Sequence, residues 1–116
     1  MYLPKQDIYT ALKGLEDVIT GLKVYQVQPE EFTDLPVITF YVGNNSVETD
    51  LNNNITYQDI TIIVDIWGRT SSESSQILNK VEETMRENLY SLEYSADVPN
   101  VDEQINHINC RFTNKI

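Results

Sequence analysis

The residues best suited to covalent catalysis are a histidine and a cysteine three positions apart, His107 and Cys110. Each is the only residue of its type in the 116-residue chain. A histidine within hydrogen-bonding reach of a thiol can activate it as a nucleophile. The residues around them alternate between polar and apolar, however, which predicts a strand, and residues three apart on a strand face opposite sides. We therefore expect a plain strand histidine and no catalytic pair.

Metal chemistry would have to come from carboxylates, because one histidine and one cysteine cannot supply the three or four ligands of a zinc site. Glu48, Asp50 and Asp59 could gather around a calcium or magnesium ion, as in a small metal-dependent hydrolase. Asp65 shares a predicted strand face with Asp59, but lies about 20 Å away at ~3.3 Å per residue. The acids also lack a regular D-x-D spacing. We therefore favour a solvated acidic surface and predict no metal, no cofactor and no catalytic residue.

The charge balance narrows the class of partner. Eighteen Asp and Glu stand against eight Lys and Arg, for a formal net charge of −10. Nucleic-acid binders usually carry a basic patch, whereas the basic residues here are scattered, which disfavours binding to DNA, RNA or anionic membranes. No apolar run approaches the ~20 residues of a membrane span, and the first residues do not resemble a signal peptide. An acidic surface fits a soluble protein, or a wall to which DNA must not adhere.

The clearest element is the segment Ile55 to Trp67, in which side chains alternate between two faces. One face is entirely aliphatic: Ile60, Ile62, Val64 and Ile66. The other face mixes apolar and acidic residues: Tyr57, Asp59, Ile63, Asp65 and Trp67. Strict alternation of this kind predicts a strand with its aliphatic face in the core. The mixed face is too apolar for free solvent and too polar for a dry core.

Two other segments carry apolar residues at helical spacing. The first runs from about Pro4 to Thr20, and the second runs from a capping box, Thr70 and Glu73, to about Leu89. The remaining predicted strands are Val24–Val27, Leu35–Val42, Tyr90–Ala96 and Glu103–Thr113. Two helices with one apolar stripe each can cover one face of a mostly antiparallel sheet. We therefore expect a single α+β domain over residues 1–116, a two-layer sandwich whose second sheet face has no cover from this chain.

Between two of these strands, residues Gly43 to Asn54 are rich in turn-forming residues and poor in apolar ones. The turn formers include Asn44, Asn45, Asp50, Asn52, Asn53 and Asn54. This composition predicts a long, mobile loop or a floppy hairpin tip at about residues 43–54. A hairpin needs only about two to five residues to turn, and loops this long in compact domains are usually functional or disordered. We favour a functional loop.

Several of these features, taken in order, carry a family resemblance. A strand opens with Leu-Pro at positions 35–36 and ends in an aromatic residue, a polar loop follows, and a long strand ends in the triplet Asp65-Ile66-Trp67. A polar-capped helix and final strands complete the pattern. From about Pro4 to Phe112 the chain thereby resembles the tail terminator proteins of long-tailed bacteriophages, also called tail-completion or tail-to-head joining proteins.

The resemblance implies a structural virion protein and not an enzyme. Family members form a ring, generally a hexamer, at the head-proximal end of the tail tube, where the ring stops tube polymerisation and docks to the head connector. The implied partners are other copies of the chain, the major tail tube protein and a head-completion or connector protein. DNA would pass through the ring without specific binding, and no membrane takes part. The chain would assemble in the host cytoplasm and reside in the neck region of the virion.

The residue patterns agree with this resemblance at three places and offer contact residues, while two alternatives stay open. The uncovered sheet face offers Tyr57, Ile63 and Trp67. The loop, which could order on assembly, offers Asn44, Asn45, Asp50, Asn52, Asn53 and Asn54. The acidic candidates for the wall of a DNA channel are Glu48, Asp50 and Asp59. Another neck or head-completion component is the alternative function, and the isolated chain could be a monomer or a ring.

Overall fold

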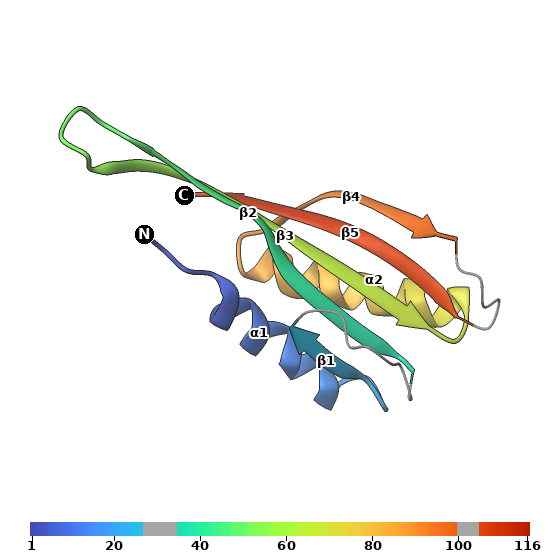
Figure 1. The fold of residues 1–116 in the computed structure, drawn as a ribbon. Helices are drawn as coiled ribbons and strands as arrows, with labels where there is room; N and C mark the ends of the chain where they lie inside the picture. The colour runs from blue at the N-terminus through green and yellow to red at the C-terminus, as the bar shows by residue number, and fades with distance from the viewer. Residues whose placement is uncertain (27–34, 100–104) are drawn as a thin grey trace.

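The structure is a computed structural model that describes residues 1–26, 35–99 and 105–116. Within these ranges the chain forms two α-helices and a five-stranded, mostly antiparallel sheet, which confirms the α+β class (Figure 1). The predicted order of helix, three strands, helix and two strands is also confirmed. The elements are α1 Lys5–Lys13, the 3-10 helix η1 Gly14–Asp17, β1 Lys23–Gln26, β2 Val37–Thr49, β3 Ile55–Gly68, α2 Ser71–Glu87, β4 Ser91–Val98 and β5 Asn106–Lys115.

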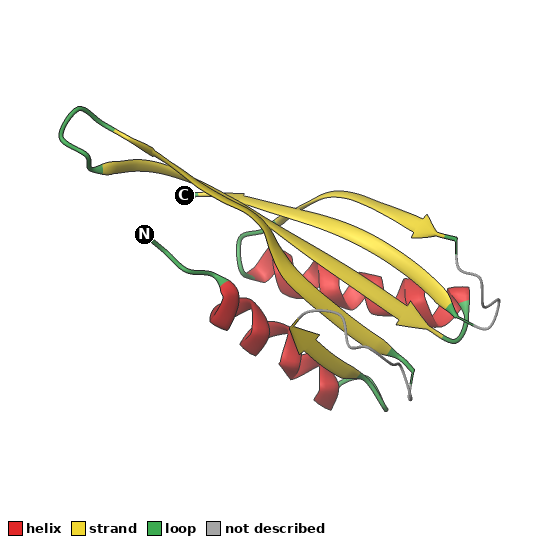
Figure 2. Cartoon of the chain, viewed as in Figure 1, coloured by secondary structure: helices red, strands yellow, loops and turns green. Residues whose placement is uncertain are grey.

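Strand β3 lies in the middle of the sheet, whose strand order is β1-β2-β3-β5-β4. β1 pairs with β2 in parallel, and the other three pairings are antiparallel (Figure 2). The register aligns the apolar residues of the three central strands, because Val64 of β3 lies opposite Phe40 of β2 and Cys110 of β5. The alternation predicted for β5 is therefore confirmed, and its apolar residues share one face with those of β3.

One hydrophobic cluster joins this sheet face to the helices. The aliphatic face predicted for the long strand, from Ile60 to Ile66, is fully buried. Burial of four such side chains contributes on the order of 6–12 kcal/mol before conformational entropy is counted. Buried helix residues belong to the same cluster, namely Ile8 and Leu12 from α1 and Ile77, Val81 and Met85 from α2.

The first helix is shorter than predicted, because α1 ends at Lys13 and the chain tightens into η1. Glycine at position 14 favours this end, since glycine has a low helix propensity. In η1, Glu16 Oε2 accepts hydrogen bonds from Lys13 Nζ and from the backbone N of Val24, each at 2.9 Å. These bonds join the end of the helix to the start of β1. Gly21, between them, has a φ of +81°, which glycine adopts readily.

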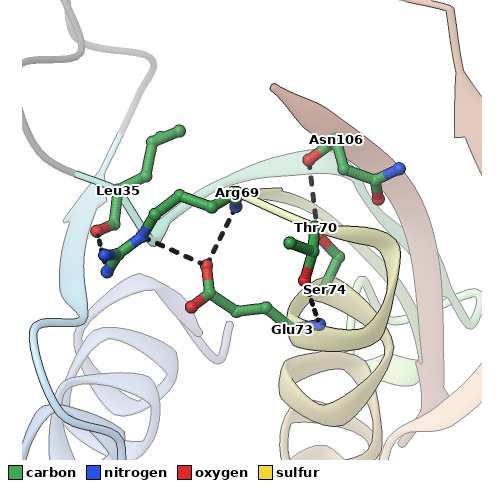
Figure 3. Close-up of polar contacts among 6 residues, drawn as sticks. All are labelled: Leu35, Arg69, Thr70, Glu73, Ser74 and Asn106. Atoms are coloured by element: carbon green, nitrogen blue, oxygen red, sulfur yellow. Dashed lines mark hydrogen bonds and ion pairs between the residues drawn. The ribbon is translucent and has the colours of Figure 1, made fainter. Parts of the chain in front are cut away.

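The second helix begins with the predicted cap (Figure 3). Thr70 Oγ1 accepts a hydrogen bond from the backbone N of Glu73 at 3.0 Å. Glu73 Oε1 reaches back to the backbone N of Arg69 at 2.9 Å, one residue earlier than the capping box predicts. The Arg69 guanidinium in turn donates to the carbonyl of Leu35 at 2.7 Å. The cap therefore also ties the start of α2 to the residues that lead into β2.

The end of α2 differs from the prediction, because the helix stops at Glu87 and Leu89 does not extend its apolar stripe. Leu89 is 76% exposed and has a φ of +71°. A residue in this left-handed conformation ends a helix, and the backbone N of Tyr90 closes the end by donating to the carbonyl of Met85 at 2.9 Å. Tyr90, and not Leu89, is buried against the core.

The largest correction concerns residues 43–54, which do not form a long loop. β2 continues to Thr49, β3 begins at Ile55, and only Asp50–Asn54 connects the two strands. The strands stay paired from Asn44 opposite Thr61 to Thr49 opposite Ile55. Turn-forming side chains predict a loop from local preference, but backbone pairing with the neighbouring strand overrides that preference here.

Gly43 marks a bulge in β2, opposite a part of β3 that still pairs with β5. A Cβ atom at this position would lie 2.9 Å from Cγ1 of Ile63, so the close approach requires glycine. Beyond the bulge the hairpin comes to project from the rest of the molecule (Figure 1). The whole molecule, hairpin included, measures 54 × 28 × 24 Å. β5 pairs with β3 only from Asp59 onward. We call residues 47–57, on the free side of that pairing, the hairpin arm.

Removal of the cap tests how far α2 depends on it. Thr70→Ala deletes the acceptor for the Glu73 backbone N and should lower the free energy of unfolding by about 1 kcal/mol, measured by chemical denaturation. Ser75→Ala is the matched control, because Ser75 is exposed in the same helix and its loss should change stability by about 0.5 kcal/mol at most. Equal losses in both variants would contradict the assigned cap.

Candidate interaction surface

The side of the sheet away from the hydrophobic cluster, which we call the outer face, carries a polar and aromatic group of side chains around Asp65. Trp67 stacks on His107, with ring centroids 4.3 Å apart and planes inclined by 16°. His107 Nε2 lies 2.8 Å from Asp65 Oδ1, and Asn109 Nδ2 donates to the same oxygen at 2.8 Å. The register explains these contacts, because it sets Asp65 opposite Asn109 and Trp67 opposite His107. The group therefore joins β3 to β5 on the outer face.

Two residues predicted to await a partner are already buried in the isolated chain. Ile63 is 7% exposed and Trp67 is 4% exposed. His107 covers part of Trp67, and Ile63 packs against Gly43. The prediction that this sheet face has no cover from the chain is therefore wrong at these two positions. Tyr57, the last residue of the arm, is half-buried.

The structure separates the residues that had the chemistry for catalysis. His107 lies on the outer face and Cys110 is fully buried in the core, which confirms that the two face opposite sides. Burial raises the pKa of the Cys110 thiol to about 12, so it stays protonated. Among the described residues, no group of three or more His, Cys, Asp or Glu side chains could hold a metal ion. Glu48, Asp50 and Asp59 are therefore not brought together as ligands.

A row of side chains crosses four strands on the outer face, and it is exposed except at Ile63. The register aligns Tyr41 of β2, Ile63 of β3, Arg111 of β5 and Tyr94 of β4. Tyr41 and Tyr94 are each about half exposed, and the Arg111 guanidinium carbon lies 5.8 Å from the centre of the Tyr94 ring. A hollow of about 340 Å³ opens beside Tyr41, Ile63 and Arg111. Tyrosine and arginine are enriched in protein–protein interfaces, so this Tyr41 row is the part of the outer face best suited to contact.

The turn at the end of the arm is ordered by Asp50. Its Oδ1 accepts hydrogen bonds from the backbone N of Asn54 at 2.9 Å and of Asn52 at 2.8 Å, and these bonds hold the pKa of the Asp50 carboxyl below its ordinary value. Asn53 has a φ of +63°, a conformation that asparagine adopts more readily than most residues. The tip of the hairpin is therefore a turn capped by Asp50, from which Leu51 projects fully exposed.

The root of the arm is held by Gln58, which the sequence analysis did not single out. Its buried side chain donates from Nε2 to the Tyr2 carbonyl and to Asn45 Oδ1, each at 2.6 Å, and accepts from the Tyr2 backbone N at 3.2 Å. Its backbone N and O pair with those of Ile116 at 2.7 and 2.9 Å. The sequence held one indication of this role. Gln58 stands two residues before Ile60 and so continues an otherwise aliphatic strand face, where a buried polar side chain needs hydrogen-bond partners.

The remaining predicted contact residues lie along the hairpin. Exposed among them are Asn44, Glu48, Asp50, Asn52, Asn53 and Asn54, whereas Asn45 and Asp59 are half-buried. The arm is acidic, since the sequence has no Lys or Arg between Lys23 and Arg69. It is also apolar in part, with exposed side chains at Val47, Leu51 and Ile55. The structure thus places the predicted loop residues on a paired, two-stranded extension.

Comparison with known proteins yields no family for the chain. No model of a protein family matches it, and no curated protein sequence matches it. The resemblance to tail terminators is therefore still a prediction from the sequence. Within residues 1–26, 35–99 and 105–116, no helix is long and apolar enough to cross a membrane.

The turn of the arm should loosen when its acceptor is removed. Asp50→Ala deletes the oxygen that binds the backbone N of Asn52 and Asn54, so these amides should exchange with solvent faster, as measured by NMR. Lowering the pH should also reduce the protection of these amides, expressed relative to their intrinsic exchange rate at each pH. A carboxyl with a lowered folded pKa stabilises fully above its ordinary value of 3.8, and this stabilisation is lost as the pH falls through the folded pKa. Glu48→Ala is the control, since it removes an exposed acid of the same arm. Unchanged protection in Asp50→Ala would contradict the capped turn.

Asp65 should matter for stability and Asp59, on the same strand face, should not. Asp65→Ala leaves two polar side chains, His107 and Asn109, without their shared acceptor, and should lower the free energy of unfolding by about 1–3 kcal/mol. The same change at Asp59 should cost about 0.5 kcal/mol or less, because within the described residues the Asn44 side chain donates to the Asp59 backbone carbonyl and not to its carboxylate. Urea denaturation measures both. A loss at Asp59 that matches the loss at Asp65 would show that the outer-face group is not the stabilising feature.

Proposed function

We propose that the chain is a structural subunit of a bacteriophage tail. It forms a ring at the head-proximal end of the tail tube, terminates tube polymerisation and joins the tail to the head connector. The observation that carries the proposal is the hairpin arm, an ordered extension with exposed apolar side chains. The resemblance of the sequence to tail terminators names the assembly in which such an arm would act.

The arm supports an assembly role through its binding thermodynamics. Val47 and Ile55 are 38% and 45% exposed, and Leu51 is fully exposed. Full burial of one such side chain contributes about 1.5–3 kcal/mol. A paired hairpin with a capped turn loses less conformational freedom on binding than a mobile loop of the same sequence would. More of the free energy gained by burying the apolar side chains then contributes to the affinity for a partner.

We further infer that both helices cover the inner face of the sheet, in a two-layer arrangement that leaves the outer face toward a neighbour. Ile8 of α1 and Val81 of α2 share one hydrophobic cluster with the inner face of β3, and Figure 2 is in keeping with this arrangement. The Tyr41 row would then be available to another copy of the chain. Its tyrosines and arginine are residue types that interfaces favour.

The acidity of the chain supports a role around passing DNA. A hexamer of chains with a formal charge of −10 would carry six times −10, or −60. A wall of this sign repels the phosphate backbone, so DNA would cross the ring without adhering. Glu48, Asp50 and Asp59 are the candidates for that wall. The major tail tube protein and the head-completion or connector protein would bind the two rims of the ring.

Tail length tests this function. Electron microscopy of tails from a phage that lacks the gene should show overlong tubes, because nothing stops their polymerisation, and supply of the wild-type chain should restore normal length. Tails of normal length in the absence of the protein would contradict a terminator. If such tails also failed to join heads, the alternative of a head-completion component would be favoured, and immunogold labelling would then locate the chain on the connector.

A further inference from the structure

A second feature suited to contact lies between the end of the first helical segment and the first turns of α2. Here a groove of about 480 Å³ is lined by residues of both segments. Its apolar lining consists of Ile77, which is buried, Ile19, which is half-buried, and Val18, which is 63% exposed. Its polar lining includes Gln76 and Lys80. The groove therefore combines an apolar surface with side chains that can donate hydrogen bonds.

We propose that the hairpin arm of one copy docks in this groove of a second copy, with Leu51 against its apolar lining. The inference rests on the proposed function, because it names the contact through which ring subunits would join. Leu51 is fully exposed at the end of the arm, and an aliphatic side chain of this kind gains most from burial against Val18 and Ile77.

Charge complementarity favours this occupant. Glu48 and Asp50 flank the apolar tip of the arm, which carries no basic residue. At the groove, the Lys80 side chain is 52% exposed, and its ion pair with a helix neighbour spans 4.0 Å, the longest among the described residues. The acid that also lines the groove, Glu73, is already bound to the backbone N of Arg69. An acidic tip would thus meet an accessible lysine and a carboxylate that already has a partner. In this arrangement Glu48 and Asp50 face the neighbouring copy, and Asp59 is the acid of the predicted set that remains for the channel wall.

The topology keeps the arm away from the groove of its own chain. β3 starts at the arm and ends at Gly68, a span of about 40 Å at ~3.3 Å per residue, and α2 starts at Ser71. The tip and the groove therefore lie toward opposite ends of the longest dimension of the molecule, 54 Å (Figure 1). In an assembly of identical chains, the groove must come from another copy. A contact between two different surfaces is head-to-tail, and it closes into a ring where the rotation between copies permits.

Disulfide formation between two purified variants tests the contact. Asn52→Cys, which keeps the Leu51 side chain beside it, and Gln76→Cys, distinguished by tags of different mass, are mixed at high concentration under mild oxidation. Both positions are exposed, so neither change should impair folding, and the native Cys110 is buried. We expect the mixed disulfide to form at least about tenfold faster than in a control mixture of Asn52→Cys with Glu83→Cys, because docking raises the effective concentration at position 76. Glu83 is exposed on the same helix but does not line the groove.

The outcomes separate this inference from the proposed function. A mixed disulfide that forms no faster than the control would overturn arm docking. If sedimentation shows that the unmodified chain self-associates in that case, the ring proposal stands on another contact. Absence of self-association would also overturn docking to a second copy, and tail length would still decide the terminator role. Suppose that the mixed disulfide forms faster than the control and that tails have normal length in the absence of the gene. This result would support arm docking and contradict the terminator function.

Discussion

The position of β3 at the centre of the sheet is the constraint on which the rest of the structure depends, because one strand has to satisfy two environments along its length. From Ile60 to Ile66 its inner face is fully buried in the cluster shared with both helices. Beyond Gln58 the strand leaves β5, yet its backbone pairing with β2 continues as far as Ile55. Main-chain hydrogen bonds do not require apolar side chains, and they satisfy the same backbone groups in the arm as in the core. One strand can therefore supply both the centre of the core and half of the arm.

Two polar side chains stabilise this continuation at its root and at its turn. Gln58 ties the root to the first residues of the chain, to the last residue and to the opposite strand of the hairpin. Asp50 binds the backbone amides of the turn. Ordering a chain segment costs about 1–2 kcal/mol per residue in backbone entropy, so a hairpin that extends past its core needs such contacts. In the folded chain that ordering is already complete, which suits the arm to protein contact.

The outer face divides into a part that stabilises the fold and a part that is open to a partner. Asp65 of β3 contacts His107 and Asn109 of the neighbouring strand β5, so its carboxylate already has partners within the chain. The Tyr41 row, one step along the sheet, presents half-exposed aromatic rings and an arginine. This division moves the candidate interface away from Trp67, toward side chains that a neighbour can reach. Together with the arm, it would give the proposed ring subunit separate surfaces for separate neighbours.

The sequence by itself determined the fold class, the order of the elements and the inner face of the core. Alternation from Ile60 to Ile66 and the spacing of the Thr70 cap depend on residues close together in the chain, so local patterns were sufficient to predict them. The arm, the burial of Ile63 and Trp67, and the role of Gln58 were decided only by the tertiary structure. The burial of Trp67 and the contacts of Gln58 depend on partners distant in the sequence, a histidine on β5 and a backbone carbonyl near the N-terminus. The arm depends on strand pairing between segments whose residue types favour a loop. Local propensity carries no information about such partners, because strand pairing and burial are set by the whole sheet.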